Sequence, residues 1–148
     1  MHKDETVIKF FATHRWLLSD PRFSKIAHER LSAAKKHLKL TRARAAKARH
    51  ALARQRATRR MASLNAHPRK AICHVFKHYC GEALRVARCE SRFSTTAQNG
   101  QYLGLFQMGA SERRLYGHGP TALQQSHAAH TYFVRSGRDW SPWSCKPW

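Results

Sequence analysis

The feature that most constrains this chain is a long stretch, Ser24–Leu64, that contains neither glycine nor proline. Alanine, leucine, arginine and lysine dominate it, and all four are good helix formers. All seven glycines lie at or after Gly81, and four of the five prolines lie at or after Pro68. Roughly forty helical residues would make a rod about 60 Å long. The sequence therefore predicts one long helix in the first part of the chain.

A thin apolar seam runs along this predicted helix. Residues recur every seven positions, with alanines between them: Leu31, Leu38, Ala45 and Leu52, with Ala27, Ala34 and Ala48. This spacing suits a weak coiled coil or a helical hairpin. Because alanine buries little apolar area, we favour a solvated basic helix that serves as a spacer.

The charge of the chain is strongly one-sided. Its 148 residues include 28 Lys and Arg against 8 Asp and Glu, a formal net charge of +20. Residues 1–67 carry 17 basic and 4 acidic residues, and residues 68–148 carry 11 and 4. The balance indicates an anionic partner, such as nucleic acid, an acidic membrane surface or anionic wall polymers. We place a boundary at His67-Pro68, between a basic helical region (1–67) and a domain (68–148).

The second region alternates short helical patterns with turns. Helices are predicted from Pro68 to Lys77 and from Glu82 to Cys89, with a break at Gly81. Asn99-Gly100 is a turn signal, and Tyr102–Phe106 suits a brief extended segment. A capping box of Thr121 and Gln124 opens a further helix that should stop at Gly137. The tail is irregular and aromatic, so the expected fold class is mainly α with a small β component.

One run of residues carries chemical information. It reads Cys-Glu-Ser-Arg-Phe-Ser-Thr-Thr-Ala-Gln-Asn-Gly-Gln-Tyr-Leu-Gly-Leu-Phe-Gln-Met and spans residues 89–108. It resembles the lytic transglycosylase and goose-type lysozyme superfamily, whose pattern is Glu-Ser-x-Phe, then Ala, then Gly-Leu-Met-Gln. It is also similar to the resuscitation-promoting factor domain, where Cys-Glu-Ser precedes Gly-Gly-Leu-Gln and a late cysteine lies near a Trp-Pro pair. The late match here is Trp-Ser-Pro-Trp-Ser-Cys at residues 140–145.

The resemblance covers about residues 70–148 and implies a small lysozyme-like domain that cleaves peptidoglycan between MurNAc and GlcNAc. It places Glu90 as the general acid and Gln107 in the sugar cleft. The other candidate substrate-binding residues are Ser91, Tyr102, Met108, Tyr132 and Trp140. Core packing stays open as the alternative role of Tyr102, Tyr132, Trp140 and Trp143.

The chemistry needs a carboxyl group that stays protonated until it meets a glycosidic oxygen. Burial beside apolar groups raises the pKa of a glutamic acid, towards about 6 in lysozyme. We expect such burial for Glu90, next to Phe93 and the Leu105-Phe106 pair. The alternative is a surface carboxylate paired with Arg88 or Arg92.

A second carboxylate is not obvious in the domain. Glu82 lies two turns up the same predicted helix, Glu112 sits in a charged stretch that we interpret as solvated, and Asp139 stays open. The resemblance implies a route that needs one acid: the substrate's N-acetyl group assists, its C6 hydroxyl attacks, and a 1,6-anhydro sugar forms. Hydrolysis by water remains an alternative, and no cofactor is implied.

The four cysteines allow two interpretations. The resuscitation-promoting factor pattern implies a disulfide between Cys89 and Cys145, which leaves Cys73 and Cys80 to each other. On one continuous helix those two would lie about 10 Å apart along the axis, so their bridge requires a turn near His78-Tyr79. The alternative is a zinc site formed by Cys73, His74, His78 and Cys80.

Paired cysteines and a wall substrate both predict an extracellular or cell-wall location. The apolar run Val7–Leu18 makes a poor signal peptide, because Lys9, His14 and Arg15 interrupt it. This favours another export route, a misassigned start, or a phage lysis or virion protein. No stretch approaches the ~20 apolar residues that a membrane-spanning helix requires. The competing hypothesis is a non-catalytic protein that binds the wall or, non-specifically, nucleic acid through residues 1–67.

Overall fold

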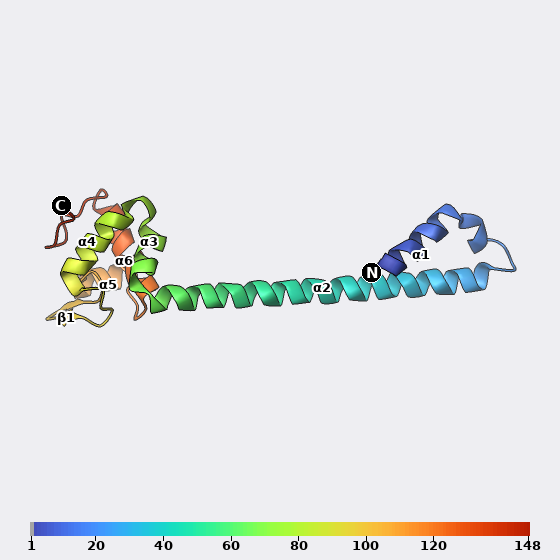
Figure 1. Cartoon of the computed structure of the whole chain (residues 1–148), viewed down its shortest axis with the longest axis horizontal. Helices are drawn as coiled ribbons and strands as arrows, with labels where there is room; N and C mark the ends of the chain where they lie inside the picture. Colours follow the sequence, from blue (N-terminus) through green and yellow to red (C-terminus); the bar gives the residue numbers. More distant parts are fainter. Residues whose placement is uncertain (1) are drawn as a thin grey trace. The chain divides into compact units, whose positions relative to one another are not determined.

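The computed structural model describes residues 2–148, and it is mainly helical with a small two-stranded sheet, which confirms the predicted fold class. The elements follow one another along the chain (Figure 1): α1 (His2–Thr13), η1 (Arg15–Leu18), α2 (Ser24–Ala66), α3 (Pro68–Phe76), η2 (Lys77–Tyr79), α4 (Cys80–Ser91), β1 (Gln98–Asn99), β2 (Tyr102–Leu103), α5 (Ala110–Tyr116) and α6 (Ala122–Arg135). Within the described residues, no helix is both long and apolar enough to cross a membrane.

The predicted long helix is α2, and it belongs to two compact units. One unit ends at Arg56, and the other comprises Ala57–Trp148. The regular helix breaks at His67, where Pro68 occupies the first turn of α3, a position that suits a residue without an amide proton. The last turns of α2 thus belong to the second unit, where Oδ1 of Asn65 accepts a hydrogen bond from the backbone N–H of Leu123 at 3.2 Å.

In the first unit, side chains join α1 to the first part of α2. Nδ1 of His37 lies 2.9 Å from Oδ2 of Asp4, and Nη2 of Arg42 donates to Oε1 of Glu5 at 3.0 Å. The buried apolar residues of this unit are Phe11, Ala27, Ala34 and Leu38. The first part of the seam is therefore buried in a helical hairpin. The hairpin was an alternative in the sequence analysis, which favoured a solvated spacer. Every residue from 47 to 63 is exposed, as a spacer would be.

The core of the second unit lies where α3, α4 and α6 meet. The ring of Phe76 sits 5.4 Å from Phe106, 5.9 Å from Phe133 and 5.6 Å from Trp140, measured between centroids. The capping box of Thr121 and Gln124 is present at the start of α6, as predicted. These contacts fix the helices around one aromatic cluster.

The turn between α3 and α4 lies near His78-Tyr79, as the predicted bridge between Cys73 and Cys80 requires, and precedes the break predicted at Gly81. It falls at Lys77–Tyr79, where the short helix η2 begins with Lys77 at a φ of 50°. Gly81 instead lies inside the first turn of α4. The reversal brings the Cα atoms of Cys73 and Cys80 to 4.5 Å, and the two residues form a disulfide.

The small sheet is a two-stranded hairpin. β1 pairs antiparallel with β2, with Gln98 opposite Leu103 and Asn99 opposite Tyr102. The predicted turn at Asn99-Gly100 is present, and Gly100 has a φ of 56°. The extended segment is shorter than predicted, because Leu105 and Phe106 turn into the core.

Gly104 allows this inward turn of the chain. It has a φ of 84°, and a Cβ added there would lie 2.5 Å from Oε1 of Gln125. The same Oε1 accepts a hydrogen bond from the backbone N–H of Leu105 at 2.9 Å. A larger residue would displace this buried contact.

Candidate active site

Glu90 lies in the last turn of α4, at the point where the chain leaves the helix. Arg92 and Phe93 follow with φ values of 54° and 68°, so the backbone reverses sharply after the acid. The hydroxyl of Ser91 is shared between the backbone carbonyls of Ala87, at 3.1 Å, and Leu105, at 2.9 Å. Ser91 therefore fixes the end of α4 to the segment before Gln107, a positioning role that differs from the predicted substrate contact.

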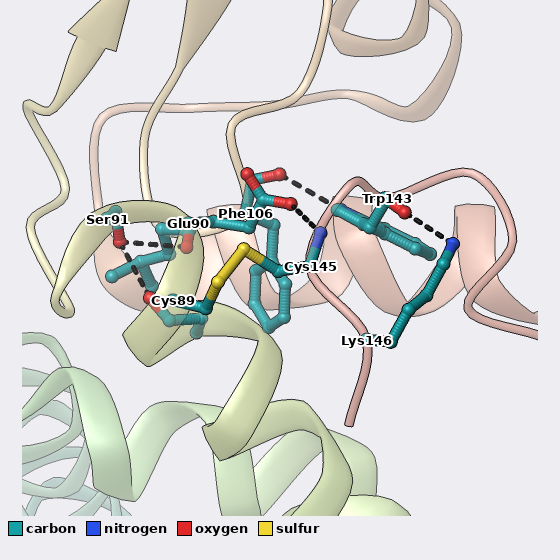
Figure 2. Close-up of a disulfide and its surroundings, with 9 residues drawn as sticks. Cys89, Glu90, Ser91, Phe106, Trp143, Cys145 and Lys146 are labelled. Atoms are coloured by element: carbon teal, nitrogen blue, oxygen red, sulfur yellow. Dashed lines mark hydrogen bonds between the residues drawn. A yellow bond between two sulfur atoms is a disulfide. The ribbon is translucent and has the colours of Figure 1, made fainter. Parts of the chain in front are cut away.

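The C-terminal tail is held against Glu90 by two bonds. Cys89 forms a disulfide with Cys145, as the sequence resemblance implied. The backbone N–H of Cys145 donates to Oε1 of Glu90 at 2.9 Å (Figure 2). No ion pair with Arg88 or Arg92 is present among residues 2–148. The surface ion pair considered as the alternative role of Glu90 is thus not formed.

Glu90 is half-buried and lines a cleft of about 390 Å³. Its other lining residues come from the hairpin, from the segment after it and from the tail: Ala97, Gln98, Asn99, Tyr102, Gln107, Pro142, Trp143 and Ser144. The lining combines amide groups with aromatic rings. Such a lining suits a sugar chain, which presents hydroxyl groups at its edges and apolar faces between them.

Gln107 lies in this cleft, where the sequence predicted it. Its Nε2 donates to the carbonyls of Ala97, at 2.8 Å, and Gly104, at 3.0 Å. The side chain therefore braces the hairpin while it forms part of the cleft wall. Tyr102 lies beside it, with 46% of its surface exposed.

A second hollow of about 240 Å³ continues from the first. The two share Tyr102, Gln107, Pro142 and Trp143, so they are parts of one groove. The additional lining residues of the second part are Gln101, Met108, Gly109, Ser111, Glu112 and Tyr132. Tyr132 and Met108 border this part of the groove, although Met108 is only 2% exposed and belongs to the core.

The position of Glu112 differs from the solvated one that the sequence predicted. This residue is half-buried and lines the groove. Burial raises the pKa of the Tyr132 phenol, and the nearby charge of Glu112 adds to this, followed by Tyr116. The groove therefore presents two carboxylates, Glu90 in one part and Glu112 in the other. The position of Glu112 depends on how α5 begins at Gly109, which no local pattern reveals.

The other two acidic residues of the unit have different roles. Glu82 accepts a hydrogen bond from Nε1 of Trp140 at 2.7 Å, and Asp139 accepts one from the backbone N–H of Ser141 at 3.0 Å. Neither residue lines the groove in the described structure. The possibility left open for Asp139 therefore receives no support.

Trp140 was predicted to contact substrate, but it lies in the core. Only 2% of its surface is exposed, and its ring packs 4.5 Å from that of Phe133. Trp143 is also a core residue, at 5% exposed, but it borders the groove as well, and its Nε1 donates to the carbonyl of Phe106 at 2.9 Å. Both tryptophans flank the same Ser-Pro pair, so the sequence alone offered no means of choosing between them.

The disulfide between Cys73 and Cys80 also bears on the zinc alternative. Both sulfur atoms are bonded to each other, so neither is a free thiolate ligand. Among residues 2–148, no cluster of three or more His, Cys, Asp and Glu side chains has a metal-binding arrangement.

Comparisons of the chain with known protein families, curated proteins and solved structures found no match.

Proposed function

We propose that the protein cleaves the glycan strands of peptidoglycan between MurNAc and GlcNAc, with Glu90 as general acid and then general base. The observation that carries this proposal is the position of Glu90: a half-buried carboxyl group beside an amide- and aromatic-lined groove, anchored by the N–H of Cys145. The sequence resemblance supplies the substrate class. The two disulfides favour action in an oxidising compartment, at the cell wall or outside the cell.

The reaction begins with a proton from Glu90 to the bridging oxygen, which turns a poor leaving group into a hydroxyl. The N–H of Cys145 binds Oε1, and it thereby orients the carboxyl group within the groove. In the single-acid route, the N-acetyl group of MurNAc assists, and Glu90 then accepts the proton of the attacking C6 hydroxyl. In the alternative, water attacks, and Glu112 is the second carboxylate available in the groove.

The Glu90→Gln variant tests the assignment of the acid. Glutamine keeps an oxygen that accepts the hydrogen bond from the N–H of Cys145, but it has no acidic proton to donate to the glycosidic oxygen. We expect turbidity loss of purified peptidoglycan to slow at least about 100-fold, the usual contribution of a general acid. Asp139→Asn is the matched control, since Asp139 is an acidic residue outside the groove. Equal clearing by Glu90→Gln and the parent protein would remove Glu90 from the mechanism.

Mass spectrometry of the released fragments distinguishes the two nucleophiles. Attack by the C6 hydroxyl yields products lighter than hydrolysis products by one water, about 18 Da. Fragments that carry the full mass would assign the reaction to water.

A second candidate function is binding of polyanions without catalysis. It is favoured by the exposed part of α2, because residues 47–63 contain basic but no acidic side chains. Binding of duplex DNA to the full chain would then weaken steeply with salt. If the protein clears peptidoglycan and the clearing depends on Glu90, binding of polyanions is not its main function.

A further inference from the structure

A hollow on the surface of the second unit has no role in the proposed reaction. It has a volume of about 670 Å³ and is lined by Arg85, Arg88, Cys89, Arg92 and Phe93. The arginines occupy positions i, i+3 and i+7 of α4 and its C-terminal cap, so their side chains share one face of the helix. Three cations thus border one concave surface.

This face points away from the groove. Glu90 lies two positions from Arg88 and two from Arg92. At about 100° per residue, its side chain therefore leaves the helix on nearly the opposite side from theirs. Glu90 lines the groove. A glycan strand bound beside Glu90 would therefore not fill the arginine-lined hollow.

A fourth arginine, from the neighbouring helix α3, lies next to Phe93 of the hollow. The guanidinium of Arg69 lies over the ring of Phe93, at 5.3 Å from its centroid. Nε of Arg85 donates to the carbonyl of Pro147, which fixes this side chain against the tail. Arg69 thus lies beside a residue that lines the hollow, and a hydrogen bond holds Arg85 to the tail.

No acidic side chain neutralises these four arginines in the described structure. The ion pairs among residues 2–148 involve Arg22, His37 and Arg42, all in the first unit. The acidic residues of the second unit lie elsewhere. Three accept hydrogen bonds, Glu82 from Trp140, Glu90 from Cys145 and Asp139 from Ser141, and Glu112 lines the groove. The hollow therefore has an unbalanced positive charge, which an anion would neutralise.

We propose that this arginine hollow binds phosphodiester groups of an anionic wall polymer. Guanidinium groups bind phosphate oxygens in pairs through their planar N–H donors. Arg69 covers one face of Phe93, and the ring packs against the core, which disfavours stacking of a nucleic-acid base. The disulfide of Cys89 borders the hollow and favours an oxidising compartment, where wall polymers are found. The anion site itself goes beyond the proposed function, whereas the choice of a wall polymer as its ligand rests on that function.

The test uses nitrogen-15-labelled full-length protein titrated with poly(glycerol phosphate), observed by NMR at the arginine Nε–H groups. We expect saturable shifts at Arg69, Arg88 and Arg92. In Arg88→Gln/Arg92→Asn, the affinity measured at Arg69 should fall about tenfold or more, since each lost charged hydrogen bond weakens binding. Asparagine is chosen at position 92 because it tolerates the left-handed backbone there.

Arg114→Gln/Arg135→Gln is the matched control, because it removes the same charge from exposed positions outside the hollow. It should leave the affinity at Arg69 unchanged.

Equal shifts at Arg114, Arg135 and the hollow would overturn the proposal, because the binding would then follow net charge alone. Tighter saturation of the same signals by DNA of equal phosphate number would assign the hollow to nucleic acid, and tighter saturation by polyglutamate would assign it to carboxylates. The Arg88→Gln/Arg92→Asn variant should still clear peptidoglycan, because Glu90 and the groove are unchanged. Loss of polymer binding is thereby distinguished from loss of the proposed reaction.

Discussion

At the scale of single residues, the site depends on side chains that do two things at once. Gln107 lines the groove and braces the hairpin through Ala97 and Gly104. Trp143 lines the groove and bonds to the carbonyl of Phe106. Substitution of either residue would change both the groove and its support, so loss of activity alone would not separate the two effects.

The pair of Glu112 and Tyr132 offers a cleaner measurement. Burial is the main cause of the raised Tyr132 pKa, and the negative charge of Glu112 raises it further by disfavouring the tyrosinate. Glu112→Gln should therefore lower the Tyr132 pKa while leaving it above the ordinary value of 10.0. Carbon-13 NMR of the Tyr132 ring as a function of pH measures this change. An unaltered pKa would mean that the Glu112 carboxylate is too far from the ring to act on it.

At the scale of elements, the two disulfides have unequal expected effects. Cys89 and Cys145 are separated by 56 positions, and Cys73 and Cys80 by 7. In the chain-entropy model, replacing the first pair by alanine costs about 4 kcal/mol of unfolding free energy, and the second about 2.5 kcal/mol. Urea unfolding of the two double variants measures the difference.

The same two variants should also differ in activity. Removal of Cys89 and Cys145 releases the tail that places its N–H on Glu90, so clearing should fall even where the protein stays folded. Removal of Cys73 and Cys80 leaves that contact in place. Equal activity of the two variants under folding conditions would show that the tail does not position the acid.

At the scale of the whole molecule, two half-buried histidines, His118 and His130, link stability to pH. Burial lowers the pKa of His118, with a further contribution from Arg113, and burial likewise lowers that of His130. The folded state therefore binds fewer protons than the unfolded chain, whose histidines titrate near 6.5. The stabilisation is complete above pH 6.5 and declines as the pH falls towards the folded-state values.

Urea unfolding between pH 7 and about pH 5 should show this decline, because the lowered pKa of Asp4 and Asp20 acts only near and below 3.8. His118→Asn should flatten the curve, since it removes one of the two linked groups. His74→Asn is the control, because His74 is exposed and is not among the groups that lower the pKa of His118 or His130. A curve of unchanged slope in His118→Asn would rule out His118 as a source of the pH dependence.

The sequence by itself determined the features that depend on neighbours along the chain. The glycine- and proline-free run makes α2 helical, Thr121 and Gln124 cap α6, and Asn99-Gly100 turns the hairpin. The family resemblance of residues 89–108 implied that Glu90 and Gln107 share a cleft, and both line the groove. The helix, the cap and the turn follow from local propensity and hydrogen bonding within a few residues.

Only the tertiary structure decided which side chains face the groove and which face the core. Trp140 and Trp143 both pack in the core, but of the two only Trp143 also borders the groove. The start of α5 placed Glu112 at the groove, where the sequence predicted a solvated residue. Each outcome depends on contacts between residues far apart in the chain, whose free energy no local pattern contains.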